Sequence, residues 1–235
     1  MEHNNKICIY HHLGLGDSFE CNGMVRHYSE IYSGVDIFAG SNYYDIIKYM
    51  YRDNPRIFVN KIDKEKEYQQ TSEYLSKYTG EILVPGHENY FSNISLFKKN
   101  KWGPAESFYF LANVPWKYRN EKFYIKRNLQ REREVLKKLN PNNEKFIFIH
   151  DDLDRGFIID LKSDKKIIRN NKNINILDLI LLLENASEIH CMSSSILCLI
   201  DCLSSSLNFN NLYLHYNVRK VQLGPNSLFA DWKIV

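Results

Sequence analysis

The sequence predicts an α/β protein made of two similar halves, residues 1–140 and 141–235. Short apolar runs typical of buried strands alternate with segments whose apolar residues recur at helical spacing, and this rhythm favours layered α/β folds. The segment 140–144, Asn-Pro-Asn-Asn-Glu, interrupts the rhythm with a turn cluster and a helix-stopping proline. The rhythm then restarts, which indicates a second half.

In the first half, the expected strands are 6–10, 35–39, 56–59 and 82–84. The first strand leads through a glycine-containing loop into a helix expected over 18–33, which Ser18 can cap. Further helices are expected over 42–51 and 64–78, with Gly80 ending the second. An aromatic-rich stretch at 102–124 then precedes a charged helix expected over 127–139.

In the second half, the strands are expected at 145–149, 188–191 and 212–215. The first of these is a continuous apolar run, as expected of a strand buried on both faces. Helices are expected over 175–184 and 194–203, where apolar residues dominate.

Composition narrows the class of protein. With 44% hydrophobic and 25% charged residues, the 235-residue chain matches ordinary globular proteins and excludes disorder, collagen and coiled coil. A net charge of +3 is too small to indicate a nucleic-acid partner. Five cysteines are too few, and odd in number, for a disulfide framework in a chain of this length. They form no CxxC pair, so a structural zinc is not indicated either. The polar start and the short apolar runs predict a cytoplasmic protein without a membrane span.

The first candidate site is Gly14-Leu-Gly16-Asp17, between a strand and a helix. Glycines there let the backbone approach a ligand such as a phosphate, and the amino end of a helix favours an anion. Position 19 is Phe, so the dinucleotide fingerprint GxGxxG is missing. Asp17 would lie at the edge of the sheet where open α/β folds bind ligands. The structural alternative is a plain turn with a capping carboxylate.

The second candidate is the loop His150-Asp-Asp152-Leu-Asp154-Arg155-Gly, directly after an apolar strand. Its carboxylates could bind a divalent metal. Alternatively, Arg155 makes a bidentate phosphate contact while Asp152 and Asp154 orient it. A solvated polar loop without a ligand stays open as the third interpretation.

The third candidate is Ser193-Ser194-Ser195, between a strand and a helix. Hydroxyls and the amides of a helix amino end make a neutral cradle suited to a diphosphate, although a serine-rich cap needs no ligand. The candidates for lining an acceptor site or its rim are His11 and His12, beside the first glycine loop, together with Asp152 and Asp154. The aromatic stretch could stack on sugars or bases, or simply pack between the halves.

The order of these motifs resembles that of glycosyltransferases of the GT-B architecture, which have two Rossmann-like halves with a cleft between them. It is similar to the heptosyltransferases, in which an early Gly-Asp supplies the base that activates the acceptor, and Asp17 matches that position. It is also similar to fucosyltransferases, in which a strand ends in a His-x-Arg loop and a Ser-Ser pair grips the donor phosphates. His150 and Ser193–Ser195 match those features, while the arginine stands at 155, farther along than in that pattern.

The resemblance implies a transferase that moves a hexosyl, heptosyl or fucosyl group from a nucleotide-diphosphate sugar, with a slight preference for a GDP-sugar, to a glycan or similar hydroxyl. Asp17 would be the general base, His150 a second catalytic residue, and inversion the stereochemical outcome. The cofactor expectation is that none is required, with a divalent metal left open. The alternatives are a non-catalytic nucleotide-sugar or phosphate binder and, less favoured, an RNA-binding protein.

Overall fold

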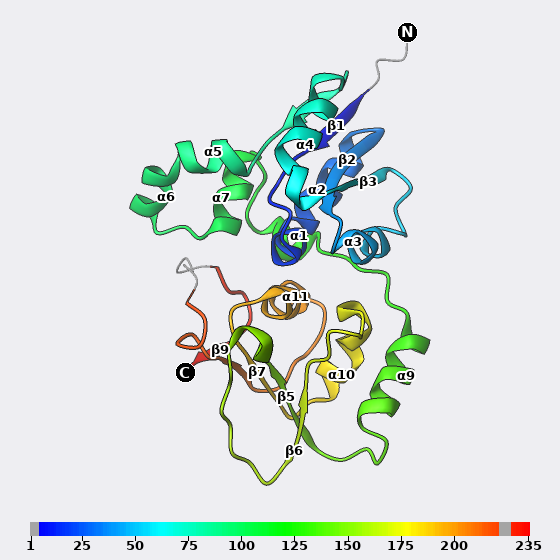
Figure 1. Ribbon diagram of the computed structural model, residues 1–235, viewed down its shortest axis with the longest axis vertical. Helices are drawn as coiled ribbons and strands as arrows, with labels where there is room; N and C mark the ends of the chain where they lie inside the picture. Colours follow the sequence, from blue (N-terminus) through cyan, green and yellow to red (C-terminus); the bar gives the residue numbers. More distant parts are fainter. Residues whose placement is uncertain (1–4, 221–226) are drawn as a thin grey trace. The chain divides into compact units, whose positions relative to one another are not determined.

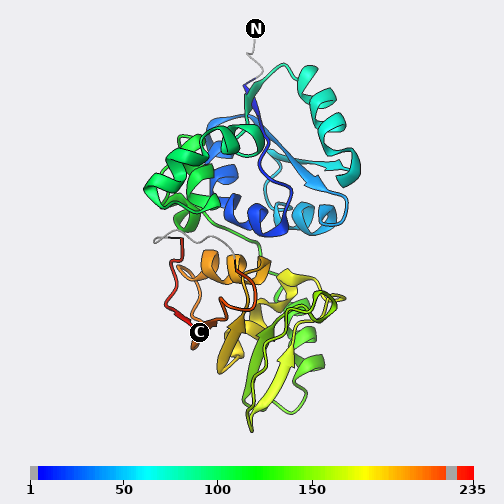
Figure 2. The same ribbon diagram turned by 60° about the vertical axis from the view of Figure 1, so that its left-hand side comes forward.

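The computed structural model describes residues 5–220 and 227–235, and it divides into two compact units that each contain one parallel sheet (Figures 1 and 2). The first unit comprises the described residues up to Lys126 together with Ser227. The second comprises residues 127–220 and 228–235. The predicted α/β class with two Rossmann-like halves is confirmed.

The sheet of the first unit has the strand order β3-β2-β1-β4, and all of its pairs are parallel. The strand bounds are Lys6–Ile9 (β1), Gly34–Gly40 (β2), Ile57–Ile62 (β3) and Glu81–Leu83 (β4). The helix bounds are Leu15–Glu20 (α1), Asn22–Ile31 (α2), Tyr44–Met50 (α3) and Glu67–Ser76 (α4), with a 3₁₀ turn at Lys64–Lys66 (η1). The central strands β1 and β2 are buried, as their apolar runs predict.

A buried carboxylate attaches α4 to this sheet. Asp36 of β2 accepts hydrogen bonds from the hydroxyls of Tyr74 and Tyr78, at 2.9 and 3.0 Å, and from the amide of Asn60 at 3.2 Å. Asp36 is only 8% exposed, so these donors replace the water that its oxygens would otherwise bind. Tyr74 of the largely polar α4 and Tyr78, two residues beyond its end, therefore position the helix on the sheet.

Four short helices follow β4 in the first unit, and the last two of them lie within the aromatic-rich stretch at 102–124. Their bounds are His87–Ser92 (α5), Ile94–Asn100 (α6), Pro104–Leu111 (α7) and Tyr118–Glu121 (α8). Phe108 and Tyr109 are fully buried, and the Tyr109 hydroxyl accepts from the Met24 amide at 3.1 Å and donates to the Glu20 carbonyl at 3.0 Å. These rings of the stretch pack into the core of their own unit.

The sheet of the second unit has the order β6-β5-β7-β8-β9, again with every pair parallel. The strand bounds are Phe146–His150 (β5), Lys166–Arg169 (β6), Glu188–Cys191 (β7), Leu212–Leu214 (β8) and Trp232–Ile234 (β9). The helix bounds are Leu129–Leu139 (α9), Ile180–Asn185 (α10) and Ser195–Leu203 (α11), with 3₁₀ turns at Leu153–Arg155 (η2) and Ile176–Leu179 (η3). The edge strands β6 and β9 were not expected from the sequence.

The two units meet one helix earlier in the chain than the boundary that the sequence predicts. The sequence places the boundary after residue 140, whereas the structure divides the chain after Lys126, so that α9 lies in the second unit. Arg131 of α9 pairs with Asp178 at 2.6 Å, and Arg127 pairs with Glu184 of α10 at 2.5 Å. The turn at 140–144 is present, with the Asn140 amide donating to the Glu144 carbonyl at 2.9 Å, but it joins α9 to β5.

The end of the chain is attached to α11 by a second buried carboxylate. Asp201 is fully buried and accepts hydrogen bonds from the backbone amides of Phe229 and Ala230 and from the Trp232 indole, at 2.9 to 3.0 Å. These hydrogen bonds attach the segment that leads into β9 to the helix. Within residues 5–220 and 227–235, no helix has both the length and the apolar character to cross a membrane.

Candidate active site

The first candidate residues lie where β1 ends and α1 begins. Gly14 is the residue before α1, while Gly16 and Asp17 are in the first turn of that helix, so Gly16 is helical and not part of a loop. A Cβ atom at Gly14 would come within 2.3 Å of the Asp17 Oδ2 atom. The Asp17 carboxylate therefore lies directly over Gly14, a position that requires the absence of a side chain there.

The environment of Asp17 changes its acidity. Burial, with a smaller contribution from the charge of Glu20, raises the pKa of Asp17 from its ordinary value to about 6. A carboxylate with a pKa near neutrality can accept a proton from a hydroxyl in a transition state and still be ionised at pH 7. This is the property expected of a general base.

His11 and His12 follow β1 but differ in their surroundings. The His11 ring is 2% exposed, and its Nδ1 donates to the His12 carbonyl at 2.6 Å, while its Nε2 has no hydrogen-bond partner among the described residues. The His12 Nε2 accepts from the His87 amide at 2.9 Å. Burial lowers the pKa of both rings to about 4, so both are neutral at pH 7.

His87 completes this cluster and was not singled out in the sequence. Its ring stacks on Tyr10 with a centroid distance of 4.0 Å and lies 3.6 Å from a carboxylate oxygen of Glu67, which also accepts from the Tyr10 hydroxyl. His87 adopts a φ of 52°, a rare left-handed conformation for a residue other than glycine. Only the pairing of β1 with β4 brings these distant segments together, so sequence spacing could not reveal them.

In the second unit, His150 and the serine turn lie at adjacent strand ends. His150 of β5 is paired with Cys191 of β7, and its carbonyl accepts from the Met192 amide at 3.2 Å. Burial lowers the pKa of His150 to about 4, and the buried Nδ1 has no partner within the described part of the chain. Ser193 is buried, and Ser194 precedes α11 with its hydroxyl accepting from the Leu197 amide at 3.5 Å.

The loop after His150 is a network of ion pairs. Asp151 pairs with Arg169 and accepts from the Ile159 amide at 3.2 Å. Asp152 pairs with both Arg155 and Lys172.

Asp154 also pairs with Lys172, at 2.6 Å. Each of the loop's three carboxylates is thus matched by a cation, and residues 5–220 and 227–235 contain no group of three or more His, Cys, Asp or Glu side chains arranged to hold a metal ion.

Arg155 is held by residues of its own loop and is partly exposed. Its Nε donates to Asp152, its guanidinium lies 5.5 Å from the Phe157 ring centroid, and its side chain is 55% exposed. A second arginine contacts the serine turn directly: Arg219 donates to the Ser193 carbonyl at 3.0 Å. Arg219 lies in a segment after β8 in which no local pattern distinguishes it in the sequence.

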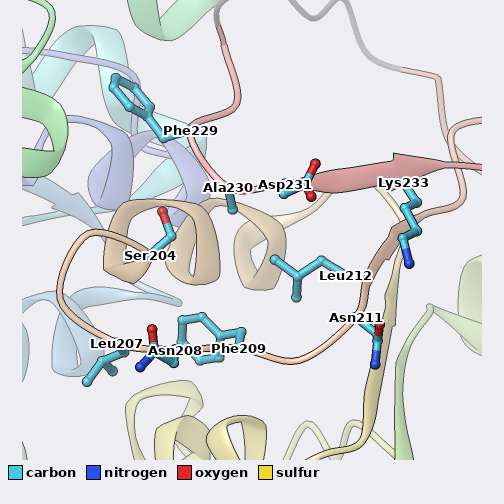
Figure 3. A pocket seen from close by; sticks show the side chains of 10 residues that line it. All are labelled: Ser204, Leu207, Asn208, Phe209, Asn211, Leu212, Phe229, Ala230, Asp231 and Lys233. Carbon is cyan, nitrogen blue, oxygen red and sulfur yellow. The ribbon is translucent and has the colours of Figure 1, made fainter.

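A cavity of about 360 Å³ lies elsewhere in the second unit (Figure 3). Its lining includes Asn208 and Asn211 before β8, and Asp231 and Lys233 at the start of β9. These are the amino ends of parallel strands, whereas His150 and Ser193 lie at carboxyl ends. The cavity is therefore separate from the predicted donor site.

Comparison with solved structures identifies the architecture. The chain is similar to a glycosyl transferase of family 9 from Veillonella parvula, with 11% identity, a TM-score of 0.59 and coverage of 100% of this chain and 88% of that one. It is also similar to ADP-heptose LPS heptosyltransferase II from E. coli, with 9% identity, a TM-score of 0.57 and coverage of 98% and 90%. No family model matches the sequence, and no curated protein matches it. At these identities the likeness concerns the fold, and the chain has the GT-B fold that its motifs predicted.

Proposed function

We propose that this protein is a glycosyltransferase that moves a sugar from a nucleotide-diphosphate sugar to a hydroxyl of a glycan or similar acceptor. Asp17 carries the proposal: it follows β1 at the start of α1, its carboxylate lies over Gly14, and burial brings its pKa to about 6. The likeness to two glycosyltransferases along nearly the whole chain supports this class of reaction.

The donor is proposed to bind the second unit. The amide groups at the amino end of α11 and the hydroxyls of Ser193–Ser195 would receive the diphosphate, and Arg155 would add a positive charge. His150, neutral at pH 7, lies beside this turn and could donate a hydrogen bond to the donor but would not add charge.

In the proposed reaction, the acceptor hydroxyl loses its proton to the Asp17 carboxylate as its oxygen bonds to the anomeric carbon. The bond from that carbon to the phosphate oxygen breaks, and its electron pair leaves with the nucleoside diphosphate. Attack from the face opposite the leaving group inverts the anomeric centre. Amides and guanidinium groups near the diphosphate stabilise the charge that develops on it.

The test measures release of nucleoside diphosphate from UDP-, GDP- and ADP-sugars, with and without magnesium, in the presence of glycan acceptors. ADP is included because one similar structure is named for ADP-heptose. We expect turnover with one donor class and a loss of about 10²- to 10⁴-fold in Asp17→Asn, the usual contribution of a general base. Asp45→Asn, a carboxylate in the first turn of α3, is the control. Equal turnover in wild type and Asp17→Asn would contradict the role of Asp17.

A further inference from the structure

The surface of α5, α6 and α7 exposes apolar side chains that a core would normally bury. Phe91 is 64% exposed, Phe110 51% and Leu96 38%, and Trp102 is half-buried against Phe110 with a ring-centroid distance of 5.0 Å. We call these four residues the aromatic patch. Figures 1 and 2 show the three helices grouped at one side of the first unit's sheet.

Two buried rings connect the members of the aromatic patch. Phe97, 1% exposed, lies 6.2 Å from the Trp102 ring and 6.4 Å from the Phe110 ring. Tyr90 lies 5.4 Å from Phe97 and 5.5 Å from Phe91. The three exposed or half-buried rings of the patch are therefore connected through buried rings beneath them, and clustered apolar exposure of this kind is typical of binding surfaces.

The patch is accompanied by an excess of positive charge. Lys98 and Lys99 at the end of α6 and Lys101 directly after it are all exposed, and they outnumber the one exposed acid of α5, Glu88. None of them has an ion-pair partner among the described residues, whereas Lys77 and Lys117 pair with glutamates on their own helices. Residues 89–105 contain these three lysines and no aspartate or glutamate.

From this combination we infer that the aromatic patch docks on the surface of an anionic lipid bilayer. Exposed phenylalanine, tryptophan and leucine enter the boundary between headgroups and acyl chains, and lysines beside them are attracted to lipid phosphates. RNA is the less suitable partner, because Leu96 offers no ring for base stacking and Trp102 and Phe110 cover part of each other. This inference does not depend on the proposed function.

The test is co-sedimentation of the full-length protein with two kinds of vesicle, one of phosphatidylcholine alone and one of phosphatidylcholine and phosphatidylglycerol in equal parts. The protein is expected to bind the anionic vesicles and to be released as salt increases. The variant Lys98→Gln/Lys99→Gln/Lys101→Gln should bind at least about tenfold more weakly, since each lysine near a charged membrane contributes appreciably. The variant Phe91→Ser/Phe110→Ser should weaken binding at every salt concentration.

Matched controls remove the same chemistry elsewhere. Lys64→Gln/Lys66→Gln/Lys137→Gln removes three other exposed lysines, and Phe58→Ser/Tyr68→Ser removes exposed rings of β3 and α4. Both controls should bind anionic vesicles like the wild type, and thermal unfolding of every variant checks that it is folded. Absence of vesicle binding by the wild type, equal losses in patch and control variants, or binding of single-stranded RNA in place of vesicles would each overturn the inference.

Discussion

Burial shifts the pKa values of the residues after β1 in opposite directions. It raises the pKa of Asp17 and lowers those of His11 and His12, because in each case it disfavours the charged form. Between about pH 4 and pH 6 the neutral forms of all three therefore predominate. As pH rises above about 6, Asp17 loses its proton while His11 and His12 stay neutral. Of these three residues, Asp17 is therefore the one that becomes an ionised base near neutral pH.

A pH–rate profile tests this at the level of one residue. If Asp17 is the base, kcat/KM should rise with pH through about 6 as the carboxylate loses its proton, and then level off. The Asp17→Asn variant should lose this rise along with most of its activity. The steady-state rate of both proteins is measured from about pH 4.5 to about pH 8.5, a range that spans the pKa of Asp17. A rise that persists in Asp17→Asn would assign it to another group.

Gly14→Ala should impair catalysis without unfolding the protein. The φ of Gly14 is −66°, which alanine adopts readily, but the new Cβ would displace the Asp17 carboxylate. We expect a lower kcat, and a kcat/KM that no longer rises at the same pH as in the wild type. The midpoint of thermal unfolding should change little. Gly34→Ala is the control, because its Cβ would contact only flexible parts of Lys6 and the Phe58 ring. Wild-type kinetics in Gly14→Ala would show that the position of Asp17 is unimportant.

At the scale of elements, two polar residues inside apolar segments hold neighbouring pieces together. Asp36 binds Tyr74 of α4 and Tyr78 just after that helix, and Asp201 binds the segment that leads into β9. In the sequence, each is a lone acid in an apolar run, and the donors lie 24 to 42 residues away. The pattern alone therefore could not distinguish a structural carboxylate from a catalytic one.

Asp201→Ala should destabilise the second unit. The substitution leaves the buried Trp232 indole and two part-buried backbone amides without their acceptor, and an unsatisfied buried donor such as the indole costs about 1–3 kcal/mol. Denaturant unfolding followed by tryptophan fluorescence should show a lower midpoint. Asp164→Ala, an exposed loop residue, should leave the midpoint unchanged. Equal midpoints for the two variants would contradict the structural role of Asp201.

Which elements the sequence predicts depends on how they are stabilised. The strands β1, β2, β5 and β7 were expected because their apolar runs are buried on both faces. The edge strand β9 is three residues long at the end of the chain, and β6 lies among polar residues, so neither shows a pattern of its own. The candidate site follows the same rule: Asp17, His150 and Ser194 follow recognisable strands, whereas His87 and Arg219 reach their places through long-range contacts.

At the scale of the whole molecule, buried imidazoles predict sensitivity to acid. His11, His12 and His150 each have a pKa of about 4 in the folded protein, below the ordinary value of 6.5. Between those pH values the unfolded chain binds more protons, so the free energy of unfolding should fall as pH decreases from 6.5 to 4.

Asp17 acts in the opposite direction, because its raised pKa contributes stability at low pH that is lost as pH rises through about 6. Three groups outweigh one, so we expect a net decrease toward acid, measured by denaturant unfolding at a series of pH values. A free energy of unfolding that stays constant or rises from pH 6.5 to 4 would contradict the burial of these rings.

The central claim is that the second unit binds a nucleotide-diphosphate sugar, while Asp17 of the first unit supplies the base. Its most direct test is whether the protein binds the nucleoside diphosphate that leaves the donor. Thermal unfolding is measured with GDP, UDP, ADP, CMP and TDP, with and without magnesium, in wild type, Ser194→Ala, Arg155→Gln and Asp17→Asn. A ligand at a hundredfold excess over its Kd stabilises the folded state by about 2.7 kcal/mol. The account predicts that one nucleoside diphosphate raises the unfolding temperature of wild type and Asp17→Asn, with smaller shifts in Ser194→Ala and Arg155→Gln. No shift with any nucleotide at millimolar concentration would contradict it.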